Sequence, residues 1–287
     1  MTYDLLISAE ELQILVASKV ALRVFDCTFD LAQPSSGEQQ YQQSHIPGAV
    51  YANLDTNLSA KHGKDTTASG GRHPLPSRYK FAEWLSSVGL ANNMQAVVYD
   101  RNGANYCGRL WWMLKWAGHA QVAVLDGGLQ AWQGAGGGVA SGEEAVHAPS
   151  SFALAPELAR LVATQTVADN LGRPEQTLID ARGAPRFRGE VEPLDPIAGH
   201  IPGALNRPFN HNMTPEGKFK PAALLKAEFE ALLAGRDPAT VVHHCGSGVS
   251  AVPNILAMQI AGLGSTGLYA GSWSDWCSDA SRPMAQG

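Results

Sequence analysis

The sequence predicts an α/β protein of two tandem domains, each a mostly parallel sheet flanked by helices. Three observations support this prediction. The length of 287 residues suits two domains better than one. Short apolar runs alternate with segments of helical spacing, which is typical of parallel sheets covered by helices on both faces. The two halves of the chain also repeat one another, which indicates a duplicated domain.

The first half contains three short apolar runs that predict strands, at residues 22–27, 96–99 and 122–125. Two segments predict helices, at residues 78–90 and 105–117. In the first of these helices, Phe81, Trp84 and Leu85 recur at helical spacing, and Gly89 supplies a stop signal.

The second half repeats this alternation. Its strands are predicted at residues 177–179, 241–243 and 267–269, and its helices at residues 222–234 and 249–261. Pro253 falls in the first turn of the last helix, where proline is tolerated.

Four short motifs occur in both halves in the same order. The sequence H-I-P-G-A at residues 45–49 recurs at 200–204, at an offset of 155 residues. Residues 24–26 match 178–180, and further on 97–100 match 241–244 and 126–132 match 270–276, the last two at an offset of 144. The smaller offset means that the first half holds 11 extra residues between the motif at 45–49 and the motif at 97–100. We assign them to the polar, glycine-rich run at residues 57–73, a predicted loop.

A stretch rich in Gly, Ala and Ser at residues 134–149 has no periodic pattern and marks the domain boundary. We therefore predict an N-terminal domain at residues 1–138, a linker at 139–155 and a C-terminal domain at 156–287.

The bulk composition excludes several kinds of partner. The chain is 45% hydrophobic and 16% charged, which is ordinary for a globular protein. A net charge of −5 without a long basic run argues against nucleic acid and against an acidic membrane surface. The sequence has no run of about 18 apolar residues that would predict a membrane span. Residues 1–11 lack a signal pattern, so we expect a cytoplasmic location.

The four cysteines, at positions 27, 107, 245 and 277, form no C-x-x-C or zinc-like pair. We therefore expect no disulfide framework, no metal and no cofactor. Cys245 differs from the other three because it follows a predicted strand and precedes a helix, on a loop that contains Gly246 and Gly248. Such loops are the usual ligand sites of open α/β sheets, and their N–H groups and the helix dipole favour a thiolate. Cys245 is the candidate nucleophile.

The first half has no equivalent nucleophile. At the offset of 144, the position of Cys245 corresponds to Arg101. We therefore expect a catalytically silent first domain and a catalytic second domain.

Twin domains, H-I-P-G-A in each and a single loop cysteine in the second resemble the two-domain rhodanese-like sulfurtransferases, over about residues 22–276. The loop C-G-S-G-V-S at residues 245–250 is similar to the C-G-S-G-V-T loop of the family's 3-mercaptopyruvate sulfurtransferases. Thiosulfate sulfurtransferases of the family typically carry basic residues directly after the cysteine, where this chain has Gly246 and Ser247. The resemblance therefore implies two tandem rhodanese-like domains and favours 3-mercaptopyruvate over thiosulfate as the sulfur donor.

The resemblance also implies a mechanism and its residues. Cys245 would take sulfur from the donor as a persulfide, release pyruvate, and pass the sulfur to a thiol, a thioredoxin-like protein or cyanide. The family's serine, histidine and aspartate proton relay matches Ser247, His73 and Asp55. His73 ends the extra segment of the first half, so that segment would bring a proton carrier to the second domain's cysteine.

The substrate-binding residues implied by the family include Arg186 and the loop residues Gly246, Gly248, Val249 and Ser250. A guanidinium group suits the donor carboxylate because it can donate two hydrogen bonds to it. The position of the family's second arginine falls on Leu194. The sequence leaves three arginines that could replace it, at positions 72, 188 and 207.

Three rival functions fit less well. A cysteine phosphatase needs an arginine at the end of its loop, and residues 245–250 contain none. A thiol–disulfide oxidoreductase needs a second cysteine nearby, and none is present. A non-catalytic binding module would have no use for an intact Cys245 loop. Thiosulfate sulfurtransferase activity, giving sulfite and thiocyanate, remains the alternative within the family.

Overall fold

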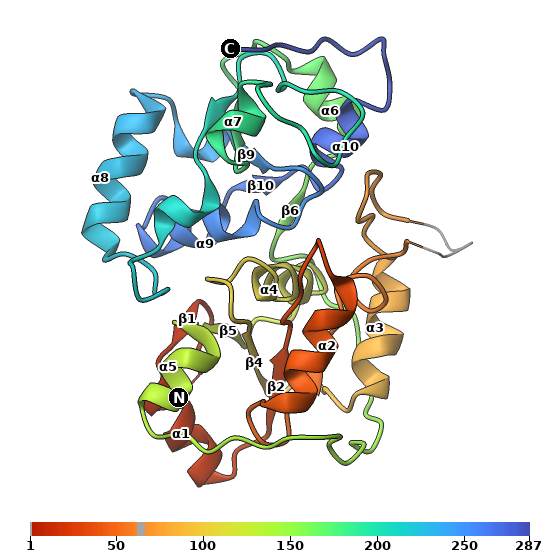
Figure 1. Cartoon of the computed structure of the whole chain (residues 1–287), viewed down its shortest axis with the longest axis vertical. Coiled ribbons are helices and arrows are strands. Elements are labelled where there is room, and N and C mark those ends of the chain that lie inside the picture. The colour runs from red at the N-terminus through yellow and green to blue at the C-terminus, as the bar shows by residue number, and fades with distance from the viewer. Residues whose placement is uncertain (1, 62–66) are drawn as a thin grey trace. The chain divides into compact units, whose positions relative to one another are not determined.

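The structure is a computed structural model that describes residues 2–61 and 67–287 (Figure 1). The chain forms two compact units, each built around its own five-stranded sheet. The first unit contains Met1–Ala60, Pro76–Leu158 and Thr214–Phe219, and the second contains Lys61–Leu75, Ala159–Met213 and Lys220–Gly287. The second unit therefore includes the end of the extra segment of the first half. The predicted linear boundary at residues 139–155 stays a prediction.

The sheet of the first unit has the strand order β1-β5-β4-β2-β3, and all neighbouring strands are parallel. Its strands are β1 (Leu6–Ile7), β2 (Leu22–Asp26), β3 (Val50–Tyr51), β4 (Gln95–Tyr99) and β5 (Val122–Leu125). Its helices are α1 (Ala9–Ser18), α2 (Pro34–Gln43), α3 (Arg78–Ser87), α4 (Cys107–Trp116) and α5 (Gly128–Gly134). All five residues of β4 are buried, as the apolar run predicts for a central strand covered on both faces.

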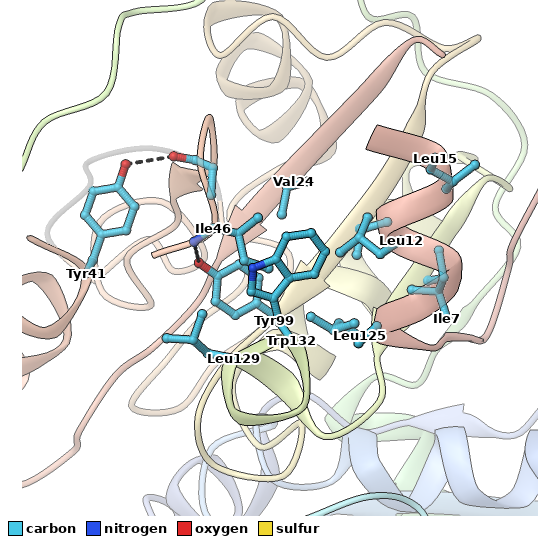
Figure 2. Packing of buried hydrophobic residues seen from close by; sticks show 14 residues of the cluster. Ile7, Leu12, Leu15, Val24, Tyr41, Ile46, Tyr99, Leu125, Leu129 and Trp132 are labelled. Atoms are coloured by element: carbon cyan, nitrogen blue, oxygen red, sulfur yellow. Dashed lines mark hydrogen bonds between the residues drawn. The ribbon is translucent and has the colours of Figure 1, made fainter. Parts of the chain in front are cut away.

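One core of the first unit lies between this sheet and helices α1 and α5, where Trp132 packs near Leu12 and Leu129 (Figure 2). The H-I-P-G-A turn is fixed to this core by hydrogen bonds. The Ile46 N–H donates to the Tyr99 hydroxyl at 3.0 Å, and the Tyr41 hydroxyl donates to the Ala49 carbonyl at 2.7 Å (Figure 2). The repeated motif therefore ties the turn before β3 to the central strand.

The sheet of the second unit has the order β6-β10-β9-β7-β8, again with parallel neighbours. Its strands are β6 (Arg160–Leu161), β7 (Thr177–Asp180), β8 (Leu205–Asn206), β9 (Val241–His244) and β10 (Gly267–Leu268). Its helices are α6 (Thr164–Asp169), α7 (Ala184–Phe187), α8 (Ala222–Leu233), α9 (Val252–Ile260) and α10 (Ser272–Trp276), with 3-10 turns η1 (Phe209–Asn212) and η2 (Pro238–Thr240). Each strand takes the place of its counterpart in the first unit, so β9 is the central strand.

The predicted fold class is confirmed: two parallel five-stranded sheets are flanked by helices. The last predicted helix begins later than expected, at Val252, because residues 245–251 form a loop and Pro253 then occupies the first turn. Within the described residues, no helix is both long and apolar enough to cross a membrane.

Candidate functional site

Cys245 lies directly after the central strand β9, at the carboxyl end of the sheet of the second unit. Its side chain is buried, and the loop around it is held by backbone hydrogen bonds to α10. The Trp273 N–H donates to the Cys245 carbonyl at 3.0 Å, and the Ser274 N–H donates to the Gly246 carbonyl at 2.9 Å. The cysteine is therefore set in a fixed loop at the position where open α/β sheets bind ligands.

Ser272, the first residue of α10, also holds the cysteine backbone. The Cys245 N–H donates to the Ser272 hydroxyl at 3.1 Å, and this hydroxyl donates to the Tyr269 carbonyl at 2.9 Å. Ser272 has φ +57°, a left-handed conformation that side chains rarely adopt, and its counterpart in the first unit is Gly128 with φ +59°. The second unit thus places a hydroxyl at a strained position where the first has glycine.

The loop can also hold an anion. Among the described residues, the N–H groups of Gly246, Ser247, Val249 and Ser250 make no hydrogen bond. Gly248 has φ +74°, and a Cβ atom on it would lie 2.3 Å from the Ala270 carbonyl oxygen, so only glycine fits there. Unpaired N–H groups of successive loop residues form the kind of cradle that stabilises a negatively charged sulfur.

The other three thiols are buried near carboxylates. Burial raises the pKa of Cys27 and Cys107 well above the ordinary value, and it also raises the pKa of Cys277. Nearby carboxylates add to the shift in each case. These groups stay protonated thiols near neutral pH and are poor nucleophiles.

The structure brings two of the three predicted relay residues together. His73 Nδ1 lies 2.7 Å from the Ser247 hydroxyl oxygen, and both side chains are buried. His73 is thus not a surface histidine. Asp55 belongs to the first unit, where the Asn53 side chain accepts a hydrogen bond from its N–H. Its assignment to the relay stays a prediction.

Two guanidinium groups lie against the residue that follows the cysteine. A Cβ atom on Gly246 would lie 3.1 Å from Arg72 Nη2 and 3.6 Å from both Nη atoms of Arg186. The Arg72 N–H also donates to the Ser274 hydroxyl at 2.9 Å, which fixes the backbone of the segment before His73. The sequence had left the second arginine open, and Arg72 is the candidate that lies at the loop.

The other positions considered for the second arginine do not supply a guanidinium group at the loop. Leu194 is 44% exposed and carries no charge. Arg188 is exposed and pairs with Glu190 at 2.6 Å. Arg207 donates to Asn212 at 2.9 Å and to Glu228 at 2.7 Å, in the region of η1 and α8.

Two buried carboxylates hold the arginines. Asp195 accepts from Arg72 and, at 3.3 Å, from Arg186. Glu192 accepts from Arg186 at 2.6 Å and from Arg182 at 3.3 Å. Burial raises the pKa of Asp195, assisted by the charge of Glu192 and opposed by the two arginines. Burial acts on Glu192 in the same way, but hydrogen bonds from Arg186 and from backbone N–H groups leave its pKa below the ordinary value.

The series of ion pairs continues from Arg182 to Asp180 and His244. Arg182 pairs with Asp180 at 2.7 Å, and Asp180 Oδ2 lies 3.9 Å from His244 Nδ1. Burial acts to raise the pKa of Asp180, but the charges of His244 and Arg182 outweigh it and leave the pKa lowered. Burial lowers the pKa of His244, and the charge of Asp180 acts in the opposite direction. His243 has different neighbours, with Nε2 3.3 Å from the Met258 sulfur.

The first unit has an arginine where the second has its cysteine. Arg101 donates to Asp26 at 3.2 Å and to the Thr28 hydroxyl, and the Asp26 carboxylate is fully buried. In the second unit the corresponding carboxylate, Asp180, receives its guanidinium from Arg182 instead. The loss of the nucleophile thus coincides with a structural ion pair in the same loop position.

Sequence reasoning missed four residues at the site: Ser272, Asp195, Glu192 and Arg182. The aligned repeats could have indicated Ser272, because it stands where the first half has Gly128. Both carboxylates lie within nine residues of Arg186 in the sequence, but only the folded chain shows that they also hold Arg72.

A family model described as rhodanese-like domain matches residues 8–135 and 163–279. A Pseudomonas aeruginosa protein named as a 3-mercaptopyruvate sulfurtransferase is 44% identical over 283 residues, covering 96% of this chain and 98% of its own. A Gallus gallus thiosulfate sulfurtransferase is 32% identical over 263 residues, covering 89% and 86%. The solved structure of the 3-mercaptopyruvate sulfurtransferase from Leishmania major matches with a TM-score of 0.80 and 32% identity, covering 96% of this chain and 74% of its own.

Proposed function

Because this chain belongs to the rhodanese-like family and is a sulfurtransferase, we propose that it takes sulfane sulfur from 3-mercaptopyruvate as a persulfide on Cys245. It then passes the sulfur to a thiol or to cyanide, and pyruvate is the first product. The observation that carries this proposal is the pair of guanidinium groups, Arg72 and Arg186, beside the residue that follows the cysteine. A thiol nucleophile next to two carboxylate-binding groups suits a donor that carries both a sulfur and a carboxylate.

In the first step the Cys245 thiolate attacks the sulfur of 3-mercaptopyruvate. A sulfur–sulfur bond forms, the carbon–sulfur bond breaks, and its electron pair leaves with pyruvate as the enolate. The proton lost by the donor thiol ends on the methyl carbon of pyruvate. Ser247 and His73 are close enough to pass a proton or to donate to the developing enolate oxygen.

In the second step an acceptor thiolate or cyanide attacks the outer sulfur, and the Cys245 thiolate leaves. Splitting the transfer into two displacements predicts ping-pong kinetics. The unpaired N–H groups of the loop would stabilise the negative persulfide between the two steps. A thioredoxin-like protein as acceptor and a cytoplasmic location stay predictions from the sequence.

Arg72 takes the place of the arginine that is missing at Leu194. Its guanidinium and that of Arg186 would bind the donor carboxylate and hold the donor sulfur over Cys245. The segment that supplies Arg72 also supplies His73, so one stretch of chain brings both a binding group and a proton carrier to the loop.

Thiosulfate is the second candidate donor. Its sulfonate-like group would also accept hydrogen bonds from two guanidinium groups, and one of the relatives described above is named for thiosulfate. The loop itself argues against it, because Gly246 and Ser247 stand where basic residues are typical of the thiosulfate enzymes. A non-catalytic binding module, the remaining alternative, would form no persulfide.

Intact-protein mass spectrometry after brief incubation with each donor tests the proposal, with Cys245→Ala as the control. We expect one added sulfur from 3-mercaptopyruvate in the wild-type protein and none in the variant. Loading from thiosulfate alone would overturn the donor. No sulfur from either donor would overturn the persulfide mechanism and favour the binding module.

A further inference from the structure

Asp195 lies between the two arginines of the site. Its carboxylate is 3% exposed and accepts from Nη1 of Arg72 with one oxygen and from Nη2 of Arg186 with the other. The remaining amines, Arg72 Nη2 and Arg186 Nη1, lie 3.1 and 3.6 Å from the point that a Cβ atom on Gly246 would occupy. Arg72 thus turns one amine to Asp195 and the other to the cysteine loop, and Arg186 Nη2, which reaches Asp195, also lies 3.6 Å from the same Gly246 position.

The charges around this carboxylate balance. Three arginines and three carboxylates alternate along one chain of ion pairs, in the order Asp180, Arg182, Glu192, Arg186, Asp195 and Arg72. The three carboxylates are at most 3% exposed, so water screens them poorly. This chain of ion pairs therefore offers the donor two hydrogen-bonding guanidinium groups without a net positive charge.

We propose that Asp195 sets the donor preference of the site by neutralising one arginine charge, so that a monoanionic carboxylate donor is preferred to the thiosulfate dianion. This inference rests on the proposed function, in which Arg72 and Arg186 bind the donor. A second negative charge on the donor meets the Asp195 carboxylate across the shared guanidinium groups. Asp195 is a positioning residue, because it acts on the donor through the two arginines.

Removal of this one charge has unequal effects on the two donors. The Coulomb energy scales with the charge of the donor, so a dianion gains twice as much as a monoanion. At an effective dielectric constant near 20, one unit charge at a distance of several ångströms changes relative affinity by roughly 10- to 100-fold. Partial exposure of the arginines, 24% for Arg72 and 21% for Arg186, favours the lower end of this range.

The test is the ratio of kcat/KM for thiosulfate to kcat/KM for 3-mercaptopyruvate, measured on one preparation of each variant. The ratio does not depend on the fraction of folded enzyme, because that fraction cancels. In Asp195→Asn we expect the ratio to rise about tenfold or more. Asp195→Glu keeps the charge and should keep the ratio within about threefold of the wild-type value.

Glu190→Gln is the matched control, because it removes an exposed carboxylate from the same loop region and should leave the ratio unchanged. An unchanged ratio in Asp195→Asn would overturn the inference, and so would an equal rise in Asp195→Glu. If Asp195→Asn loads sulfur from neither donor while the other variants load normally, the inference is overturned in favour of a purely structural role for Asp195. Failure of wild-type enzyme to load from either donor would instead overturn the proposed function.

Discussion

His73 Nδ1 lies 2.7 Å from the hydroxyl oxygen of Ser247, although 174 residues separate the two in the sequence. Both side chains are buried, and Ser247 lies two residues after Cys245 on the same loop. A histidine placed in this way can exchange a proton with the serine, so the two side chains should act as one unit.

The first prediction concerns this pair. His73→Asn and Ser247→Ala should each lower kcat with 3-mercaptopyruvate about 100-fold, because positioned proton transfer contributes about that much. The double variant should lose about as much as either single variant, since each change breaks the same relay. Steady-state pyruvate release checks this, with His211→Asn, an exposed histidine, as the control. Losses that multiply in the double variant would show that the two residues act independently.

The second prediction concerns the arginines. Arg72→Lys and Arg186→Lys should each raise KM for the donor about tenfold with a smaller change in kcat, because lysine keeps the charge and loses the two-pronged hydrogen bond. Arg188→Lys is the control, since Arg188 is exposed and pairs with Glu190. An unchanged KM in Arg72→Lys would exclude Arg72 from donor binding.

The central strands could be predicted because each contains a short apolar run, at residues 96–99 in β4 and 241–242 in β9, and the cysteine loop could be predicted because it stands between a strand and a helix. All residues of β4 and β9 are buried, and the repeats fix the positions of both strands. The two-residue edge strands β1, β3, β6 and β8 could not be predicted, because two residues carry no periodic pattern.

Contacts between distant residues could not be predicted either. Arg72 and Asp195 are 123 residues apart, and neither residue type identifies the other as its partner. Arg101 was predicted only as the residue in place of the cysteine. Its role as the cation for Asp26 depends on Thr28, which replaces the arginine that the second unit has two residues after its aspartate.

The third prediction concerns this pair in the first unit. Arg101→Ala should destabilise the protein by about 3 kcal/mol, because it leaves the buried Asp26 carboxylate without its cation. Adding Thr28→Arg to this variant copies the arrangement of Asp180 and Arg182 and should restore part of the loss. Urea unfolding checks both. Equal stability of the wild type and Arg101→Ala would show that other groups stabilise the Asp26 charge.

The fourth prediction concerns Ser272. Ser272→Ala keeps the left-handed backbone strain and leaves the buried Cys245 N–H without an acceptor, so it should destabilise by about 2 kcal/mol. Ser272→Gly loses the same hydrogen bond but relieves about 1 kcal/mol of strain. The glycine variant should therefore be the more stable of the two, while both transfer sulfur more slowly because the cysteine backbone is released. Equal stability of the two variants would show that the φ of +57° carries no strain.

The last prediction concerns acid. Burial, with help from the charges of His244 and Arg207, lowers the pKa of His243 to about 3, so the folded protein keeps this histidine neutral. In the unfolded chain, His243 binds a proton below the ordinary histidine pKa of about 6.5. His243 therefore costs stability as pH falls from about 6.5 towards 3, by up to about 1.4 kcal/mol per pH unit.

His243→Gln removes this proton and should flatten the pH dependence of the free energy of unfolding between pH 6.5 and 4.5, even though it lowers stability at neutral pH. Urea unfolding across this range measures the slope, and His211→Gln, at an exposed position, should leave it unchanged. The buried His244, whose pKa burial also lowers, contributes a slope of the same sign, which both variants retain. Parallel curves for the wild type and His243→Gln would show that His243 titrates alike in the folded and unfolded states.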